Sequence, residues 1–248
     1  MKPAVVVIIA TKDRPNTLDR ALKSVSNQTA LPDKVIVVSD CSEALFKDTS
    51  NAVSKYSKNI DVELFRNKRS GNLSGAMNTA LEILLDFFIP EQTVCAILDD
   101  DDEWASDHLE KCLSVFDTGK FDVIVSGLIR HESFNDQGTF LPIPTNPTVH
   151  DFLIGNPHIQ GSNLFLRLSS FLECGGFDES LCSTTDRDLC IRLLNSGAKF
   201  GMTAYHTVHH WALFGRNRLS DPGSARKKSG LIQFYQKYCN LMTKEEEA

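Results

Sequence analysis

The sequence predicts an α/β fold in which helices flank a mostly parallel central sheet, and three observations support this prediction. In about the first hundred residues, short apolar runs alternate with segments whose apolar side chains recur at helical spacing. The run at residues 5–9 is continuous and rich in β-branched residues, as expected of a strand buried on both faces. Polar and acidic residues directly follow several runs, at the edge where such sheets bind ligands.

The predicted elements of the first half follow one another in strand–helix order. We expect strands at residues 5–9, 35–38, 62–65 and 94–98. Helices are expected between them, at residues 15–25, 43–56 and 73–88. Repeated β-α-β units of this kind imply parallel strands joined by right-handed crossovers.

The second half is less regular. We expect strands at residues 122–130 and 161–167, a proline-rich loop between them, and helices at 186–195 and 229–238. A chain of 248 residues is routinely one domain in α/β folds, so a single domain is expected over residues 1–248. Within it we distinguish residues 1–104, residues 105–210, and residues 211–248, the last of which hold a flexible basic loop and a C-terminal helix.

Composition excludes several classes of protein. The net charge of -6 argues against nucleic-acid binding, which needs clustered Lys and Arg. The seven cysteines are scattered without a Cys-x-x-Cys pair, so neither a zinc site nor a disulfide framework is indicated. No stretch approaches the ~20 apolar residues of a transmembrane segment, and no signal peptide is recognised. We expect a cytoplasmic protein, with peripheral association at the inner membrane face as an alternative; the oligomeric state is left open.

Four adjacent aspartates, residues 99–102, follow the predicted strand at 94–98. Their mutual repulsion calls for a countercharge, which a hard divalent cation bridging substrate phosphates would supply. Asp99 and Asp101 project to the same side of an extended segment and together suit Mn²⁺ or Mg²⁺. A solvated acidic loop is the alternative. An EF-hand loop is excluded because Trp104 stands where the tight turn requires glycine.

Residues after the first two predicted strands suit nucleotide binding. Thr11, Asp13 and Arg14 lie between the first strand and the first helix, where backbone N–H groups face an anion or a base edge. Asp40 ends the second strand, where an acidic residue commonly binds a ribose hydroxyl; a turn-forming role is the alternative. The segment ATKDRP lacks the glycine pattern of dinucleotide-binding oxidoreductases, and the chain has no P-loop.

With these residues in order, the sequence resembles the family 2 glycosyltransferases of the GT-A (nucleotide-diphospho-sugar transferase) fold, from residue 4 to about residue 210. The similar segments are VIIATKDRP, VVSDCS, SGNLSGAMNTAL and LDDDDEWASDHL, and, most specifically, GGFDE followed by Asp186-x-Asp188. Three residues depart from the family pattern: Met77 replaces Arg, Ser106 replaces Pro, and Thr185 replaces Glu.

The resemblance implies an inverting, metal-assisted enzyme that moves a sugar from a nucleoside diphosphate sugar, with UDP favoured, to a hydroxyl of a carbohydrate, lipid-linked or other acceptor. It implies that Asp186 is the catalytic base. A helix N-terminus would keep this carboxylate ionised and make it a weaker base. Donor contacts are implied for the following residues: Thr11, Asp13, Arg14, Asp40, Asn78, Asp99 and Asp100.

Two further assignments concern the end of the chain. His206, His209 and His210 follow a predicted strand within MTAYHTVHHW, and the resemblance suggests His209 as a metal ligand beside Asp99 and Asp101; an unliganded histidine is the alternative. Arg216 and Arg218 lie in a basic Gly/Ser-rich segment that is either a solvated linker or a flap over the diphosphate.

Two other functions stay open at this point. A nucleotidyltransferase would make the sugar nucleotide, although it would need a glycine-rich loop that is absent after the first strand. A catalytically inactive GT-A domain could bind carbohydrate, although the carboxylates needed for catalysis are present.

Overall fold

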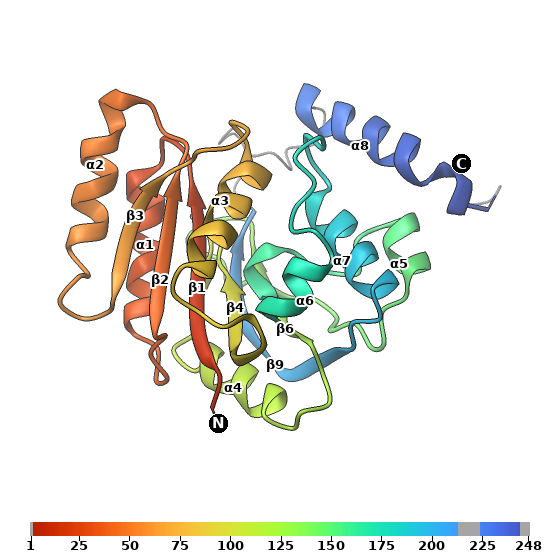
Figure 1. Cartoon of the computed structure of the whole chain (residues 1–248), viewed down its shortest axis with the longest axis horizontal. Helices are drawn as coiled ribbons and strands as arrows, with labels where there is room; N and C mark the ends of the chain where they lie inside the picture. Colours follow the sequence, from red (N-terminus) through yellow and green to blue (C-terminus); the bar gives the residue numbers. More distant parts are fainter. Residues whose placement is uncertain (1, 213–223, 244–248) are drawn as a thin grey trace.

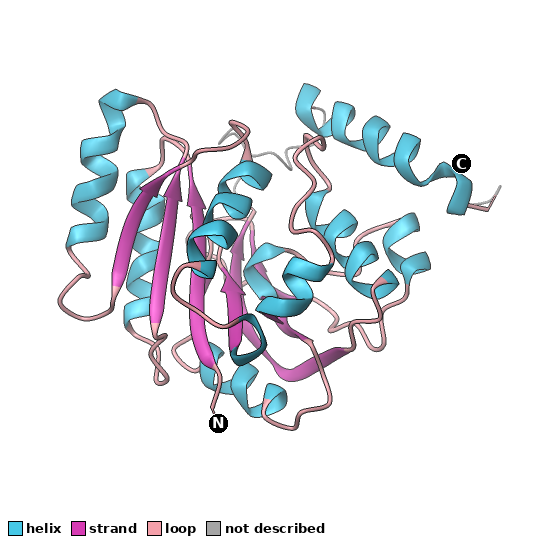
Figure 2. Cartoon of the chain, in the orientation of Figure 1, coloured by secondary structure: helices cyan, strands magenta, loops and turns pink. Residues whose placement is uncertain are grey.

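The computed structural model describes residues 2–212 and 224–243. Over these residues, nine strands form one twisted sheet with helices on both faces (Figures 1 and 2). The strands are β1 (Ala4–Thr11), β2 (Lys34–Ser39), β3 (Val62–Arg66), β4 (Thr93–Ile97), β5 (Glu103–Trp104), β6 (Val123–His131), β7 (Thr139–Phe140), β8 (Leu164–Arg167) and β9 (Phe200–Trp211). One sheet therefore runs through both halves of the described chain.

The strand order is β3-β2-β1-β4-β8-β6-β9-β5, with β7 paired to β6. Strands β1 to β4 are mutually parallel, which confirms the β-α-β interpretation of the first half. Strand β8 enters antiparallel between β4 and β6, and β6 and β9 are again parallel. The carboxyl ends of β1, β2 and β4 thus meet at one edge of the sheet, which is where ligands bind in open α/β sheets.

The helices divide between the two faces of the sheet. They are α1 (Pro15–Ser26), α2 (Glu43–Ser54), α3 (Leu73–Leu85), α4 (His108–Phe116), α5 (Val149–Ile154), α6 (Leu168–Glu173), α7 (Thr185–Asn195) and α8 (Ala225–Tyr238), with 3₁₀ turns at Pro90–Gln92, Gly161–Asn163 and Cys239–Leu241. Helices α1, α2 and α4 share one core with Val5, Val7 and Ile9, whereas α3 and α5–α8 share the other core with Val6 and Ile8. This alternation along β1 explains its unbroken apolar sequence.

The second half departs from the sequence-based expectations in several places. The segment expected as a strand at 161–167 begins as a 3₁₀ turn, and β8 starts only at Leu164. Strand β9 continues to Trp211, so the three histidines lie within it and do not follow it. Helices α5 and α6 were not expected, because six residues are too short for a clear helical period. Helix α8 begins at Ala225, four residues before the expected start.

None of the helices in the described ranges is long and apolar enough to cross a membrane.

Candidate active site

A cavity of about 940 Å³ opens at the carboxyl ends of β1, β2 and β4. Its first wall holds residues at the ends of these strands or just after them: Thr11, Asp13, Arg14, Asp40, Asp99, Asp100 and Asp101. Its second wall comes from α7, β9 and α8 and holds these residues: Asp186, Arg187, His210, Arg226 and Lys227. The volume suits a small-molecule ligand, and the charged lining suits one with several polar groups. Both halves of the chain contribute residues to this site.

An arginine and a threonine hold the acidic cluster on the first wall. The Thr11 hydroxyl donates a hydrogen bond of 2.6 Å to Asp100. The Arg14 guanidinium lies 3.3 Å from an oxygen of Asp100 and 3.2 Å from one of Asp101. Burial and the neighbouring Asp101 raise the pKa of Asp100 to about 7, even though Arg14 and Thr11 favour its ionised form. The acidic pair is therefore a place where positive charge stabilises the fold.

The two carboxylates assigned to the nucleotide hold the turns after β1 and β2 together. Asp13 has a left-handed backbone (φ 54°), and its carboxylate accepts a 3.0 Å hydrogen bond from the backbone N–H of Ser42. Asp40 forms a 2.6 Å ion pair with Lys12 and accepts a hydrogen bond from Asn67. A left-handed conformation is uncommon outside glycine, and such strain often occurs at ligand-binding turns.

Asp102 does not line the cavity but anchors its second wall. Its side chain is fully buried, accepts a 2.7 Å hydrogen bond from the Ser162 hydroxyl, and accepts another from the backbone N–H of Trp211. The ring of His210 is a further neighbour, with Nδ1 3.1 Å from a carboxylate oxygen of Asp102. The fourth aspartate of the cluster thus fixes the end of β9 against the end of β4.

His210, and not His209, is the histidine that lines the cavity. His209 lies with Nδ1 2.9 Å from Nε2 of His131, which in turn pairs with Asp136. Consecutive side chains of a strand point to opposite faces, so only one of the two adjacent histidines can face the cavity. The structure does not bring His209 to Asp99 and Asp101 as expected.

Asp186 lies in the first turn of α7 and faces the cavity. Burial raises its pKa to about 6, although Lys227, a backbone hydrogen bond from Gly161 and His210 each favour the ionised form. The expectation that the helix N-terminus would make this carboxylate a weaker base is therefore wrong. Loss of hydration outweighs the helix dipole, because the dipole contributes only about 0.3–1 kcal/mol at such a position.

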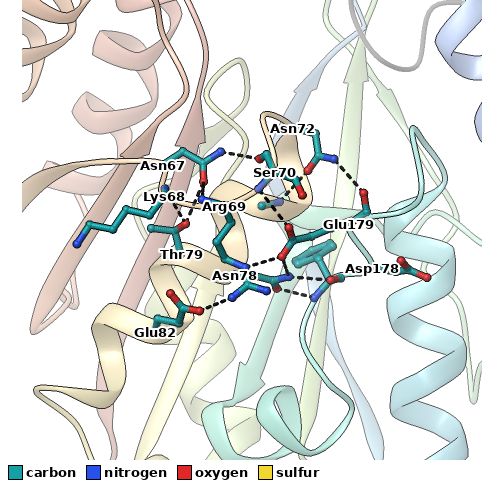
Figure 3. Close-up of polar contacts among 12 residues, drawn as sticks. Asn67, Lys68, Arg69, Ser70, Asn72, Asn78, Thr79, Glu82, Asp178 and Glu179 are labelled. Carbon is teal, nitrogen blue, oxygen red and sulfur yellow. Dashed lines mark hydrogen bonds and ion pairs between the residues drawn. The ribbon is translucent and has the colours of Figure 1, made fainter.

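Asn78 does not line the cavity, although the resemblance implied that it contacts the donor. Its amide donates 2.8 Å hydrogen bonds to the carbonyl of Phe177 and to the carboxylate of Glu179, and its oxygen accepts one from the N–H of Phe177 (Figure 3). At Gly176, which has φ 66°, a Cβ would lie 2.5 Å from that oxygen. The GGFDE segment is thus folded around Asn78, and Asn78 joins α3 to the second half of the chain.

Several residues that sequence reasoning did not single out also line the cavity. Arg187 directly follows Asp186, and Lys227 and Arg226 come from the first turn of α8. Ser74, near the start of α3, has a buried hydroxyl without a hydrogen-bond partner in the part of the chain that the structure describes. Only the basic character of residues 215–228 pointed toward this wall. Arg216 and Arg218 lie outside the described residues.

A family model described as glycosyl transferase family 2 matches residues 6–175, more than half of the chain. The chain belongs to this family. It is therefore a glycosyltransferase, and its sheet and helices form the GT-A fold.

Curated members of glycosyl transferase family 2 are similar over most of the chain. The amylovoran biosynthesis glycosyltransferase AmsB of Erwinia amylovora is 27% identical over 215 residues, which are 82% of this chain and 69% of AmsB. An uncharacterized glycosyltransferase of Bacillus subtilis, YwdF, is 24% identical over 236 residues, which are 90% of this chain and 80% of YwdF.

Solved structures of glycosyltransferases share the fold. Residues 1–349 of S. aureus TarS superpose with a TM-score of 0.64 at 20% identity, covering 85% of this chain and 60% of that one. The mannosyltransferase PcManGT from Pyrobaculum calidifontis, in complex with GDP-Man and Mn²⁺, gives 0.64 at 16% identity, covering 97% of this chain and 65% of that one. This chain thus spans less than two thirds of each of these structures.

The acidic wall of this family member fits a divalent cation that is completed by substrate. No group of three or more His, Cys, Asp or Glu side chains within the described residues is arranged to hold a metal ion alone. Mg²⁺ is typically held by one or two carboxylates plus substrate phosphates, and Asp99 and Asp101 both line the cavity. At Gly161 a Cβ would lie only 3.1 Å from an Asp99 oxygen, so this glycine allows the backbone to approach the carboxylate closely.

Proposed function

We propose that this glycosyltransferase moves a sugar from a nucleoside diphosphate sugar to an acceptor hydroxyl with inversion at the anomeric carbon. One observation carries the proposal: a single cavity is lined by the strand-end carboxylates on one wall and by Asp186 on the other. We assign donor binding to residues 1–104, acceptor binding to 105–210, and all of residues 1–248 to one domain.

The first wall is proposed to hold the donor. Asp13 and Asp40, at adjacent turns, would contact the base and ribose, and Thr11, Arg14 and Asp100 the diphosphate side. Structures of TarS have been solved with UDP and with UDP-GlcNAc, and that of PcManGT with GDP-Man, which supports a donor of this class. We favour UDP among the nucleotides, because it is common in the family.

Asp99 and Asp101 would hold Mn²⁺ or Mg²⁺ together with oxygens of the donor diphosphate. When bound, such an ion neutralises the negative charge that develops on a departing diphosphate. Mn²⁺ accompanies GDP-Man in the structure of PcManGT, which supports the use of a divalent metal. Arg14 lies between Asp100 and Asp101 and supplies part of the countercharge.

Asp186 is proposed to act as the general base. The acceptor oxygen forms a bond to the anomeric carbon, the bond to the diphosphate oxygen breaks, and the acceptor's proton passes to the Asp186 carboxylate. A pKa of about 6 leaves this carboxylate mostly ionised at neutral pH and makes it a stronger base than an exposed aspartate. Lys227 and His210 lie near enough to stabilise its ionised form.

The first test is calorimetry of UDP and UDP-GlcNAc binding with Mn²⁺ and with EDTA. We expect metal-dependent binding to the wild type, and Asp101→Ala should weaken it at least tenfold, about 1.4 kcal/mol. Asp117→Ala is the matched control, because Asp117 is an exposed aspartate at the end of α4 and does not line the cavity.

EDTA should weaken UDP binding by the wild type about as much as Asp101→Ala does, and should have little further effect on that variant. If Asp101→Ala and the wild type bound UDP equally well in Mn²⁺, the assignment of Asp101 to metal binding would be contradicted. Tenfold tighter binding of GDP or dTDP than of UDP would overturn the nucleotide assignment alone.

A further inference from the structure

Helix α8 lies at one edge of the described chain, beside α7 and away from the parallel strands (Figure 1). Its inner face is firmly held. Phe234 and Tyr238 are buried in the core, and the Tyr238 hydroxyl donates a 2.7 Å hydrogen bond to the fully buried Asp188 of α7. At Gly230 a Cβ would lie 2.1 Å from the Ser183 hydroxyl oxygen, so the two segments are in close contact. The helix therefore presents a fixed outer surface.

One flank of this outer surface is apolar. Leu231, Ile232 and Tyr235 are 42%, 59% and 44% exposed, although side chains of this kind are usually buried. Their spacing of i, i+1 and i+4 places them along one side of the helix. Lys228, four residues before Ile232, lies on the same side one turn earlier. We name Leu231, Ile232 and Tyr235 the outer flank.

The charge of α8 is opposite to that of the whole protein. The helix contains Arg226, Lys227, Lys228 and Lys237 and no acidic residue, whereas the chain has a net charge of -6. Arg226 and Lys228 are exposed, while Lys237 pairs with Asp178 and Asp188. Of the exposed cations, Lys228 lies on the side of Leu231, Ile232 and Tyr235, and a basic residue beside exposed apolar side chains on a positively charged helix is the pattern of helices that lie in a membrane interface.

We propose that the outer flank of α8 seats this enzyme on the surface of an anionic lipid bilayer. Ile232 and Tyr235 would enter the boundary between headgroups and acyl chains, and Lys228, one turn before Ile232, would contact the anionic headgroups. Charge complementarity selects this occupant over a second copy of the chain, because a two-fold contact through α8 would bring two positive helices together. Arg226 and Leu231 also line the cavity, so the bilayer would lie beside the site. The inference rests on α8 and does not depend on the reaction proposed above.

The experiment is flotation of the full chain with two kinds of vesicle, of phosphatidylcholine alone and of phosphatidylcholine with about one third phosphatidylglycerol. We expect binding to the anionic vesicles, at least tenfold weaker binding to the neutral ones, and a loss of binding as salt is raised. Lys228→Gln should weaken binding to the anionic vesicles about fivefold, as expected for one basic residue near such a surface.

The double variant Ile232→Ser/Tyr235→Ser should weaken binding to the anionic vesicles at least tenfold. Leu85→Ser/Phe87→Ser is its matched control, because these side chains are 49% and 61% exposed on a different surface. Thermal melts establish that both variants are folded.

Three results would overturn the proposal: a wild type that does not float, equal flotation of the two double variants, or binding that is indifferent to phosphatidylglycerol. A fourth result that would overturn the proposal can come from size-exclusion chromatography. A dimer that only Ile232→Ser/Tyr235→Ser dissociates would mean that a second copy, and not lipid, covers the outer flank.

Discussion

The two walls of the cavity are built in different ways. The first wall consists of residues that directly follow parallel strands, and each of them lies within a few residues of β1, β2 or β4 in the sequence. The second wall combines residues from α7, β9 and α8, which follow one another in the chain but reach the cavity only through the packing of two helices and the register of a strand. A site at the ends of parallel strands can thus be predicted from local patterns, whereas a site formed by packed helices depends on the whole fold.

The largest expected effect would test the catalytic role of the second wall. Asp186→Asn should lower the rate of sugar transfer by about 10²–10⁴-fold, because an amide cannot accept the proton of the attacking hydroxyl. Release of UDP from UDP-GlcNAc, with water as acceptor, measures the rate, and calorimetry of UDP binding should show little change. The loss should therefore appear in kcat.

The stability of this variant is informative as well. A carboxylate whose pKa is raised by folding is penalised when ionised, so its neutral replacement should leave Tm unchanged or higher at pH 7. Asp107→Asn is the matched control, because Asp107 also lies at the N-terminal end of a helix, makes no capping hydrogen bond and does not line the cavity. A folded Asp186→Asn enzyme with near wild-type activity would show that Asp186 only complements the helix end.

The same contrast explains which residues sequence reasoning placed correctly. Thr11, Asp13, Asp40 and the acidic cluster were expected at one sheet edge, and the parallel order of β1, β2 and β4 brings them there. For these residues the strand end alone determines the position. The buried role of Asp102 was not visible, because its partner Ser162 is about 60 residues away in sequence and belongs to an unexpected 3₁₀ turn.

The histidines show why the second wall resisted prediction. The pairing of β6 with β9 contains register shifts between Val125 and Leu128, and a shift by an odd number of residues exchanges the side chains that face the cavity. No local pattern reveals such a shift, so His209 and His210 could not be distinguished from sequence. The expectation for the pKa of Asp186 failed for a related reason, because its burial and its neighbours Lys227, Gly161 and His210 are set by tertiary packing, which the helix pattern does not reveal.

A smaller effect, on the pH dependence of the reaction rate, should also test the second wall. The base is the ionised form of Asp186, which is populated above its pKa of about 6. At saturating donor, UDP release should therefore be nearly independent of pH just above neutrality and should fall about tenfold per pH unit well below 6. A rate without an acidic limb between pH 5 and 8 would contradict the assignment of Asp186 as a base with a raised pKa.

Lys227→Met sharpens this pH test. The Lys227 ammonium lowers the pKa of Asp186, so its removal should move the midpoint of the acidic limb to higher pH. A purely structural role of Lys227 would change the rate equally at every pH. Lys228→Met, one residue further along α8 and exposed, should leave the midpoint in place.

The smallest expected effect on nucleotide binding concerns Asn78, which joins α3 to the segment between α6 and α7 and does not line the cavity. Asn78→Ala removes both hydrogen bonds to the backbone of Phe177 and one to Glu179 (Figure 3). Leaving buried backbone groups unpaired costs about 1–3 kcal/mol, so we expect Tm to fall by several degrees. Affinity for UDP should change less than about twofold, since Asn78 does not line the cavity.

Glu179 offers a second readout of the same contact. Although burial raises its pKa, hydrogen bonds from Asn78, Ser70 and Arg69 lower it to about 2. Asn78→Ala should therefore move the Glu179 pKa upward, and the stability lost in the variant should be greatest above that pKa, where the carboxylate is ionised. Asn51→Ala, at an exposed position of α2, is the control and should leave Tm almost unchanged. If Asn78→Ala kept its Tm and lost tenfold in UDP affinity, Asn78 would be a donor contact, as the family resemblance implied. The two halves of the chain would then be held together without Asn78. In that case α3 would have to be counted as part of the first wall, which binds the donor.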